Sequence, residues 1–194
     1  NMAVQQDGKY LLGPDFFAIA KRYTFIEFRQ FICQEMLNLQ RSFPEIVISF
    51  TELIKFGIVV MLRVSPERLG VVQRPFSDNI TFLHNLSGHV YQAFLDQQQY
   101  QRIISHLNQH HDTTRNLLKK DAELQRIRKR GYALACDERQ ILFSMPCWRA
   151  SSTIAGVLSV KMPCGTAKDV DSLRDELLEA TRTIADHYRE ETAS

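Results

Sequence analysis

The chain has 194 residues, of which 44% are hydrophobic and 24% are charged, a composition typical of a globular protein with a substantial core. Its 24 Lys and Arg residues against 22 Asp and Glu residues leave a formal net charge of +2, which gives little support for a surface that coats nucleic acid or adheres to a membrane. The four cysteines, Cys33, Cys136, Cys147 and Cys164, contain no CxxC pair, and the apolar runs are too short to span a bilayer, so the sequence predicts a protein of the reducing cytoplasm without a zinc ribbon or a disulfide framework.

The first part of the chain predicts an unstructured start followed by two helices. Residues 1–9 are polar and without pattern, which is typical of a disordered start or of a remnant left by cloning. Residues 10–24 combine an early proline with apolar residues at helical spacing, so we expect a linker helix there. Thr24 and Glu27 have the spacing of a capping box, and a longer amphipathic helix is expected over residues 25–42.

The centre of the chain changes to the period of strands and then returns to that of helices. Residues 46–64 are rich in β-branched side chains and predict a hairpin, and residues 69–74 predict a further strand. Helical spacing follows over residues 85–95, 100–107 and 114–130.

The last third of the chain predicts strands followed by one long helix. Gly131 ends the preceding helix in the left-handed cap position. Strands are expected near residues 132–136, 141–148 and 152–162, and an amphipathic helix over residues 167–190. Because helices and strands occur in segregated runs, the predicted fold class is α+β with an antiparallel sheet, not a doubly wound parallel one.

The strand GVLSVKMP, residues 156–163, raises the question of what one of its faces contacts. Its alternate apolar residues face the core, whereas Ser159 and Lys161 share the opposite face. A lysine in an apolar cavity without a partner would pay a heavy desolvation penalty. Lys161 must therefore lie in water, pair with an acid such as Asp137 or Glu52, or await an anionic ligand, and the sequence leaves these three alternatives open.

Several different short motifs follow one another along the chain, near the ends of the expected helices and strands. They are YLLGP at residues 10–14, Pro44-Glu45, Ser87-Gly88, Gly131-Tyr132-Ala133, the acidic Asp137-Glu138, Pro146 after a strand, and Ser159 with Pro163 in the last strand. In this order and spacing they resemble the C-terminal effector-binding domain of IclR-type (isocitrate lyase regulator) bacterial transcription factors. Two departures leave the effector undefined, because both border the expected cavity. The loop between Gly131 and Pro146 is short, and residues 81–86 read TFLHNL in place of the family's Pro-Leu-His-Ala-Thr-Ala.

The resemblance implies a profilin-like or GAF-like fold, in which one curved antiparallel sheet is flanked by helices and holds a ligand on one face. It implies an effector-binding and oligomerisation domain over residues 25–194, with the family's winged helix-turn-helix domain absent from this chain. It also implies a small-molecule effector (an organic or aromatic acid), a homodimer or homotetramer, and contact with DNA only through the absent N-terminal domain. No cofactor, metal, membrane contact or enzymatic activity is expected.

The same resemblance implies an effector site between a helix start, the acidic loop and the last strand. Its candidate residues are His84, Asn85, Ser87, Gly88, Asp137, Leu142, Ser159 and Lys161. Ser87 and Gly88 stand at a helix start, where unpaired N–H groups and the helix dipole favour a carboxylate, although Ser87 could equally cap the helix. Ser159 matches a family serine that binds the effector, and Lys161 replaces a second one. Asp137 either accepts a hydrogen bond from an effector hydroxyl or is an exposed loop carboxylate.

Other candidate sites have simpler structural explanations. His106 and His110 lie four residues apart, with His111 and Asp112 adjacent, which is a metal-binding pattern but also suits a polar helix end. No histidine and acid can be assigned to activate Cys147, so we expect it to be inert packing. Two rival functions stay open: a GAF-like signalling module that binds a nucleotide or a protein partner, and a small cysteine-dependent enzyme.

Overall fold

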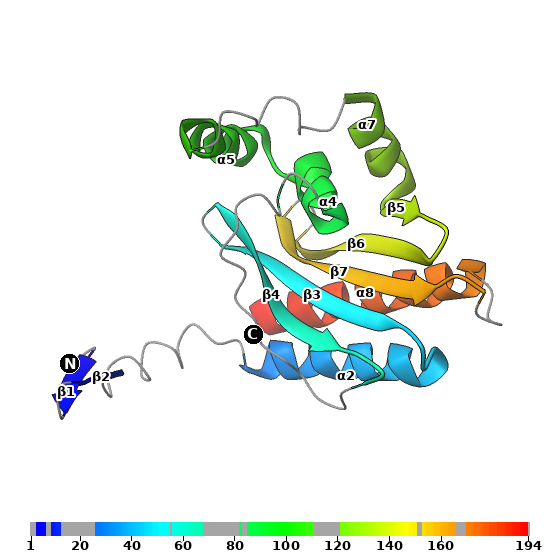
Figure 1. Cartoon of the computed structure of the whole chain (residues 1–194), viewed down its shortest axis with the longest axis horizontal. Coiled ribbons are helices and arrows are strands. Elements are labelled where there is room, and N and C mark those ends of the chain that lie inside the picture. The colour runs from blue at the N-terminus through cyan, green and yellow to red at the C-terminus, as the bar shows by residue number, and fades with distance from the viewer. Residues whose placement is uncertain are drawn as a thin grey trace.

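The computed structural model describes residues 3–6, 9–12, 26–54, 56–67, 82, 85–110, 121–150, 153–165 and 170–193. Within these residues the chain forms a five-stranded antiparallel sheet, five helices and a separate pair of short strands (Figure 1). This arrangement confirms the α+β class that the segregated runs predicted.

The central sheet joins two hairpins that are distant in the sequence. Its strands are β3 (Val47–Ile54), β4 (Gly57–Val64), β5 (Ala133–Cys136), β6 (Gln140–Ala150) and β7 (Thr153–Pro163). They lie in the order β4-β3-β7-β6-β5, and each neighbouring pair is antiparallel. The central strand β7 therefore contacts β3 on one side and β6 on the other. The further strand predicted over residues 69–74 lies outside the described residues.

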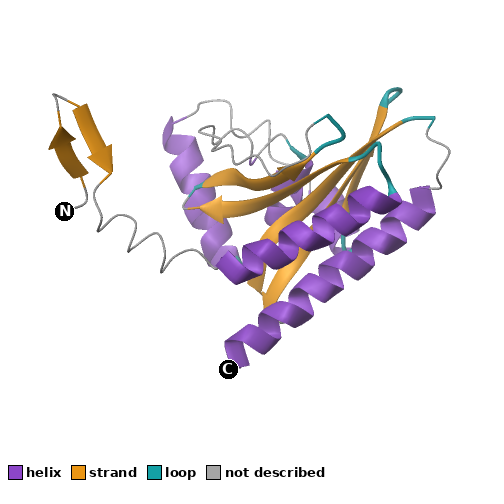
Figure 2. Ribbon diagram, turned by 90° about the horizontal axis from the view of Figure 1, so that it is seen from below, coloured by secondary structure: helices purple, strands orange, loops and turns teal. Residues whose placement is uncertain are grey.

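Helices cover both faces of this sheet. On one face α2 (Ile26–Ser42) and α8 (Val170–Ala193) lie side by side, as Figure 2 shows, and pack with alternate strand residues such as Phe50 and Leu158 into one core. On the other face α4 (Leu86–Phe94), α5 (Gln97–His110) and α7 (Asp121–Arg130) form a second core with residues such as Val157. The period of two along each strand thus supplies apolar side chains to two cores at once.

The surroundings of two residues in the β6–β7 hairpin explain why glycine is required at one and proline is tolerated at the other. A side chain on Gly156 would collide with the ring of Phe50 and would lie 2.7 Å from the carbonyl oxygen of Thr51, so only glycine fits. Pro146 lies inside β6, within the strand expected near residues 141–148, whereas the resemblance placed it after a strand. It is tolerated because β5 pairs with β6 only as far as Ser144, so the missing N–H falls where that edge of β6 has no paired strand.

The first described residues form a hairpin, where the sequence predicted an unstructured start over residues 1–9 and the beginning of a linker helix at residues 10–12; the helix prediction is wrong for these three residues. β1 (Ala3–Gln6) and β2 (Lys9–Leu12) are antiparallel, with Gln5 opposite Tyr10. Strands of four residues are too short for a period of two to stand out in a polar segment. The rest of the predicted linker helix, residues 13–24, lies outside the described residues.

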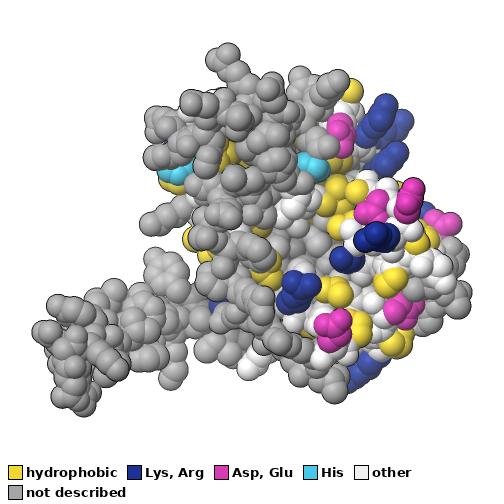
Figure 3. Space-filling view, in the orientation of Figure 1, with side chains coloured by type: hydrophobic (Ala, Val, Ile, Leu, Met, Phe, Trp, Pro, Cys, Tyr) yellow, Lys and Arg dark blue, Asp and Glu magenta, His cyan; other side chains and the backbone are white. Residues whose placement is uncertain are grey.

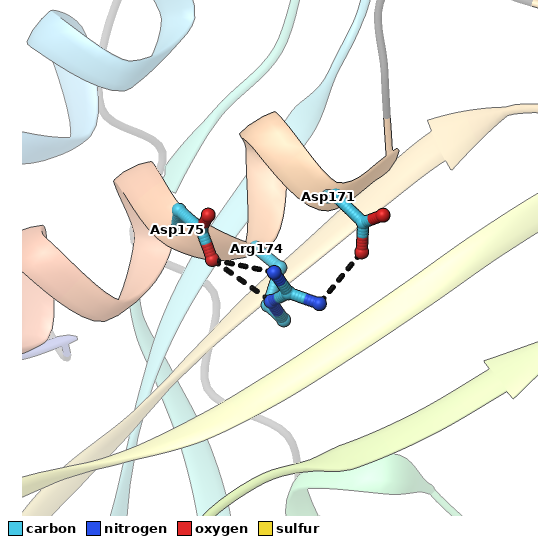
Figure 4. A network of polar contacts seen from close by, with 3 residues as sticks. All are labelled: Asp171, Arg174 and Asp175. Atoms are coloured by element: carbon cyan, nitrogen blue, oxygen red, sulfur yellow. Dashed lines mark hydrogen bonds and ion pairs between the residues drawn. The ribbon is translucent and has the colours of Figure 1, made fainter.

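Helix α8 begins with a cluster of charged side chains on its exposed side. The guanidinium of Arg174 donates to Asp171 at 2.6 Å and to Asp175 at 2.9 Å, as Figure 4 shows. Hydrogen bonding to Asp175 raises the pKa of Arg174, and Asp171 complements the positive end of the helix. Such exposed pairs contribute little to stability. In the part of the chain that the structure describes, no helix combines the length and the apolar character needed to cross a membrane.

Candidate functional site

An open pocket of about 230 Å³ lies between the start of α4 and the sheet. Strands β3, β4, β6 and β7 and helix α4 all contribute to its wall. Five of the eight residues predicted for the effector site line it: Asn85, Ser87, Leu142, Ser159 and Lys161. The structure therefore brings these five together, and their role in binding an effector stays a prediction.

Three serine hydroxyls form a chain across one end of the pocket. The Oγ atom of Ser159 lies 2.7 Å from that of Ser144 and 2.8 Å from that of Ser87. The sheet register explains the first contact, because Ser144 stands directly opposite Ser159, and Ser87 reaches the pair from α4. Three hydroxyls bring three protons, and the two contacts use two of them. One proton therefore remains for a further acceptor.

The start of α4 is capped by Asn85, not by Ser87. Asn85 has extended backbone angles, φ −95° and ψ 161°, and its Oδ1 accepts a hydrogen bond of 2.7 Å from the N–H of Gly88. The capping alternative for Ser87 is therefore wrong, and its hydroxyl is directed to Ser159. Because the amide of Gly88 is already engaged, a carboxylate at this helix start would meet the amides of Leu86 and Ser87, which have no partner inside the helix.

Two cationic side chains stand at the edge of the pocket. Lys161 and Arg63 are both exposed, and both line it. The register places Arg63 opposite Ser49 and Lys161 opposite Val47, so the two charges come from strands on either side of β3. Among the described residues that line the pocket there is no Asp or Glu. The local field therefore favours an anion.

Asp137 lies beside the pocket without lining it. Its Oδ1 accepts hydrogen bonds from the amides of Arg139 at 2.8 Å and Gln140 at 2.9 Å, which closes the turn between β5 and β6. These bonds, together with the positive charge of Lys161, lower the pKa of the Asp137 carboxyl. Asp137 thus shapes the turn. Its negative charge interacts with Lys161 from outside the pocket wall.

Glu52 is not a partner of Lys161. It alternates with Ser49 and Thr51 along β3, so it points to the opposite face of the sheet, where it lies 3.6 Å from Arg29 of α2. Burial raises the pKa of Glu52, and the charge of Arg29 acts in the opposite direction. Of the three alternatives for Lys161, the structure shows the exposed one, with an anion-favouring pocket behind it.

Two further predicted site residues, Asp137 and Gly88, do not line the pocket, and four polar lining residues were missed. Gly88 is buried in the first turn of α4 and is absent from the pocket wall, and His84 lies outside the described residues. The missed polar lining residues are Ser49, Thr51, Arg63 and Ser144. Each is a polar residue within an apolar strand, on the face of the sheet that α4 covers. Polar residues at such positions are the signal by which the sequence could have indicated a site. Only the register of the strands shows that they meet.

The rival candidate sites have structural roles. The ring of His106 stacks on that of Phe56, with centroids 4.1 Å apart, and no group of three His, Cys, Asp or Glu among the described residues could hold a metal. His111 and Asp112 lie outside those residues. Cys147 is fully buried, and burial raises the pKa of its thiol to about 12, so it is not a thiolate at neutral pH.

The basic end of α7 is mostly a solvated surface. Lys and Arg side chains gather over this helix in Figure 3, and the last turn carries Arg128, Lys129 and Arg130, all exposed. One of them also has a structural contact: the Nε of Arg128 donates to the carbonyl oxygen of Ala93 at 2.6 Å, which joins α7 to the end of α4.

Solved structures share this fold, although no protein-family model and no curated protein matches the chain. An IclR homolog from Microbacterium hydrocarbonoxydans, solved in complex with 4-hydroxybenzoate, has a TM-score of 0.67 at 19% identity and covers 96% of this chain and 78% of its own. The IclR protein of Thermotoga maritima has a TM-score of 0.64 at 18% identity, over 96% of this chain and 79% of that chain. The C-terminal domain of the E. coli transcriptional regulator KdgR has a TM-score of 0.62 at 16% identity, over 83% of this chain and 98% of that domain. At these identities the likeness establishes the fold, and the ligand must be inferred from the chemistry of the pocket.

Proposed function

We propose that this chain, which has the fold of the effector-binding domain of IclR-type transcriptional regulators, is a ligand-sensing regulatory domain that binds a small carboxylic acid between α4 and β7. The observation that carries the proposal is the composition of the pocket. A chain of three hydroxyls and the first amides of α4 lie at one end, and the cations Lys161 and Arg63 stand at the edge, without an acid in the described wall.

The size and lining of the pocket favour a compact, partly apolar acid. Its volume of about 230 Å³ is below the ~300–1,000 Å³ of pockets that hold drug-sized ligands. Val60, Leu86 and Leu142 supply apolar wall. A ring or short chain with one carboxylate would satisfy both parts. 4-Hydroxybenzoate, the ligand of the Microbacterium homolog, has this chemistry and is the first compound to test.

Such a ligand would act on α4, because the pocket lies between this helix and the sheet. Ser87 belongs to α4 and Ser159 to β7, so a molecule that contacts both biases how the helix sits on the sheet. This produces regulation only if the ligand prefers one of two arrangements. We propose that the preference changes the packing of subunits in a homodimer or homotetramer, and thereby operator binding by a DNA-binding domain in the same protein.

A thermal-shift and calorimetry panel of aromatic and aliphatic acids tests this function. A ligand at a hundred times its Kd adds about 2.7 kcal/mol to the stability of the folded state. Lys161→Met and Arg63→Gln should each weaken binding of the best acid by about fivefold at low salt, as expected for one exposed charge contact of about 1 kcal/mol. Lys129→Met, on the exposed side of α7, is the matched control and should leave affinity unchanged.

Two outcomes would overturn the proposal. One is that no acid binds, while purine nucleotides in the same panel stabilise the protein, which would favour the GAF-like signalling alternative. The other is that an acid binds with equal affinity to the parent chain and to both pocket-edge variants, which would place its site elsewhere.

A further inference from the structure

Two exposed cysteines lie together at one end of the sheet. Cys136 is the last residue of β5, and Cys164 directly follows β7. Both thiols contact the carbonyl oxygen of Asp137, with Sγ–O distances of 3.6 Å for Cys136 and 3.3 Å for Cys164. Because both sulfurs lie within 3.6 Å of the same oxygen atom, the two thiols are neighbours.

The fold brings these cysteines together across the start of β6. Strand β6 lies between β5 and β7, and Cys136 is opposite Ile141. The amide of Cys164 donates to the carbonyl oxygen of Arg139 at 2.8 Å, so the turn between β5 and β6 lies against the end of β7. Both side chains are accessible, whereas Cys147 is buried and Cys33 is half-buried.

We propose that Cys136 and Cys164 form a reversible disulfide when the protein meets a peroxide. One thiol, as its thiolate, attacks a peroxide oxygen of H₂O₂. The O–O bond breaks, a sulfenic acid forms, and the released hydroxide takes up the thiol's proton as water. The second sulfur then attacks the sulfenic sulfur, the S–S bond forms and a second water leaves. The two thiols lose two electrons, and the peroxide gains them.

The surroundings of the pair suit a transient disulfide more than a permanent one. Exposed thiols at a turn can be both oxidised and reduced from solvent, which is typical of redox-sensing disulfides in a reducing compartment. Desolvation and the neighbouring Cys136 raise the pKa of Cys164, which limits its thiolate fraction at neutral pH and slows the reaction. The bond would join the turn at Asp137 to the end of β7, next to Lys161 of the pocket.

Peptide mapping of the full chain tests the proposal without any ligand. Trypsin places the four cysteines in four different peptides: Cys136 in GYALACDER, residues 131–139, and Cys164 in MPCGTAK, residues 162–168. After treatment with H₂O₂ and blocking of free thiols, we expect these two peptides joined, at a mass lower by two hydrogen atoms than their sum. Dithiothreitol should separate them.

Variants decide which cysteines are required. Cys136→Ser and Cys164→Ser, both at exposed positions, should abolish the joined peptide while the far-ultraviolet circular dichroism stays unchanged, and Cys33→Ser should retain it. The proposal is overturned if Cys136 and Cys164 remain open to alkylation after oxidant treatment, if the joined peptide contains Cys33 or Cys147 instead, or if only disulfide-linked dimers of the chain appear on a non-reducing gel.

Discussion

Removing the central hydroxyl of the serine chain is the sharpest test of how the site is held together. Ser159→Ala deletes both contacts, of 2.7 Å to Ser144 and 2.8 Å to Ser87. Ser144 is 1% exposed and Ser87 5% exposed, so neither hydroxyl regains water in exchange. One hydrogen bond contributes about 0.5–1.5 kcal/mol, and a buried group left unpaired costs about 1–3 kcal/mol. We therefore expect Ser159→Ala to lower the free energy of unfolding by about 2–3 kcal/mol.

Urea unfolding followed by tryptophan fluorescence measures this loss. Trp148 is the single tryptophan of the sequence, and its ring meets Phe94 of α4 edge-on, with centroids 5.4 Å apart. Its emission therefore reports the packing of α4 on β6. Ser105→Ala, at an exposed position of α5, is the matched control and should change the free energy of unfolding by less than about 0.5 kcal/mol.

A double-mutant cycle separates the hydroxyl chain from general effects of the substitution. Ser87→Ala removes only the contact at 2.8 Å, so a loss of about 1 kcal/mol is expected. The double variant of Ser87 and Ser159 should lose less than the sum of the two single losses, because both delete the same contact. The reasoning is refuted if Ser159→Ala behaves like the Ser105 control, or if the two losses are simply additive.

Three further predictions concern residues around the site. Gly156→Ala should lower the free energy of unfolding by about 3 kcal/mol, because its Cβ would meet a buried ring and the carbonyl oxygen of Thr51. Gly165→Ala, at φ +83° in open space, should lower it by about 1 kcal/mol. Equal shifts of the melting temperature for the two variants would contradict this. Tyr91→Phe should lose about 1–2 kcal/mol in urea unfolding, since its hydroxyl donates to the Thr51 carbonyl at 2.9 Å in the core, and a negligible loss would mean that this bond is not formed. The pKa of Asp137, measured by NMR titration, should lie below the ordinary aspartate value of 3.8. The contribution of Asp137 to stability is full above that value and is lost as the pH falls through the lowered pKa. An ordinary or raised pKa would show that the turn bonds are absent.

The helices and strands were predictable because their apolar periods are local properties of the sequence. The spacing of apolar residues predicted α2 over residues 25–42 and α8 over residues 167–190, within a few residues of their observed bounds. The pairing of β3 with β7 is different. It joins segments that are more than a hundred residues apart, and nothing local encodes that Ser49 stands opposite Ser159. Polar residues on β3, β4 and β6 therefore became site residues only once the register was known.

The start of α4 likewise could not be predicted from the local sequence alone. In NLSG, both Asn85 and Ser87 are good N-cap residues, so the sequence allows two helix starts. The extended backbone at Asn85 decides between them, and the choice frees the hydroxyl of Ser87 for the sheet. A shift of the helix start by two residues would have removed the link between α4 and β7. The candidate site thus depends on a local choice that tertiary packing makes.

The hydroxyl chain should contribute mainly to the stability of the fold, and the cations mainly to affinity for the acid. A ligand that separates Ser87 from Ser159 breaks a hydrogen bond already made, so the new bonds to these hydroxyls bring little net gain. A carboxylate near Lys161 and Arg63 meets two charges for which the described pocket wall offers no competing acid. Lys161→Met should therefore weaken binding of the best acid about fivefold with little loss of stability, whereas Ser159→Ala should mainly lower stability. Calorimetric titration of both variants at a temperature where each is folded compares them directly. If Ser159→Ala loses far more affinity than Lys161→Met, the hydroxyls and not the cations are the main determinants of recognition.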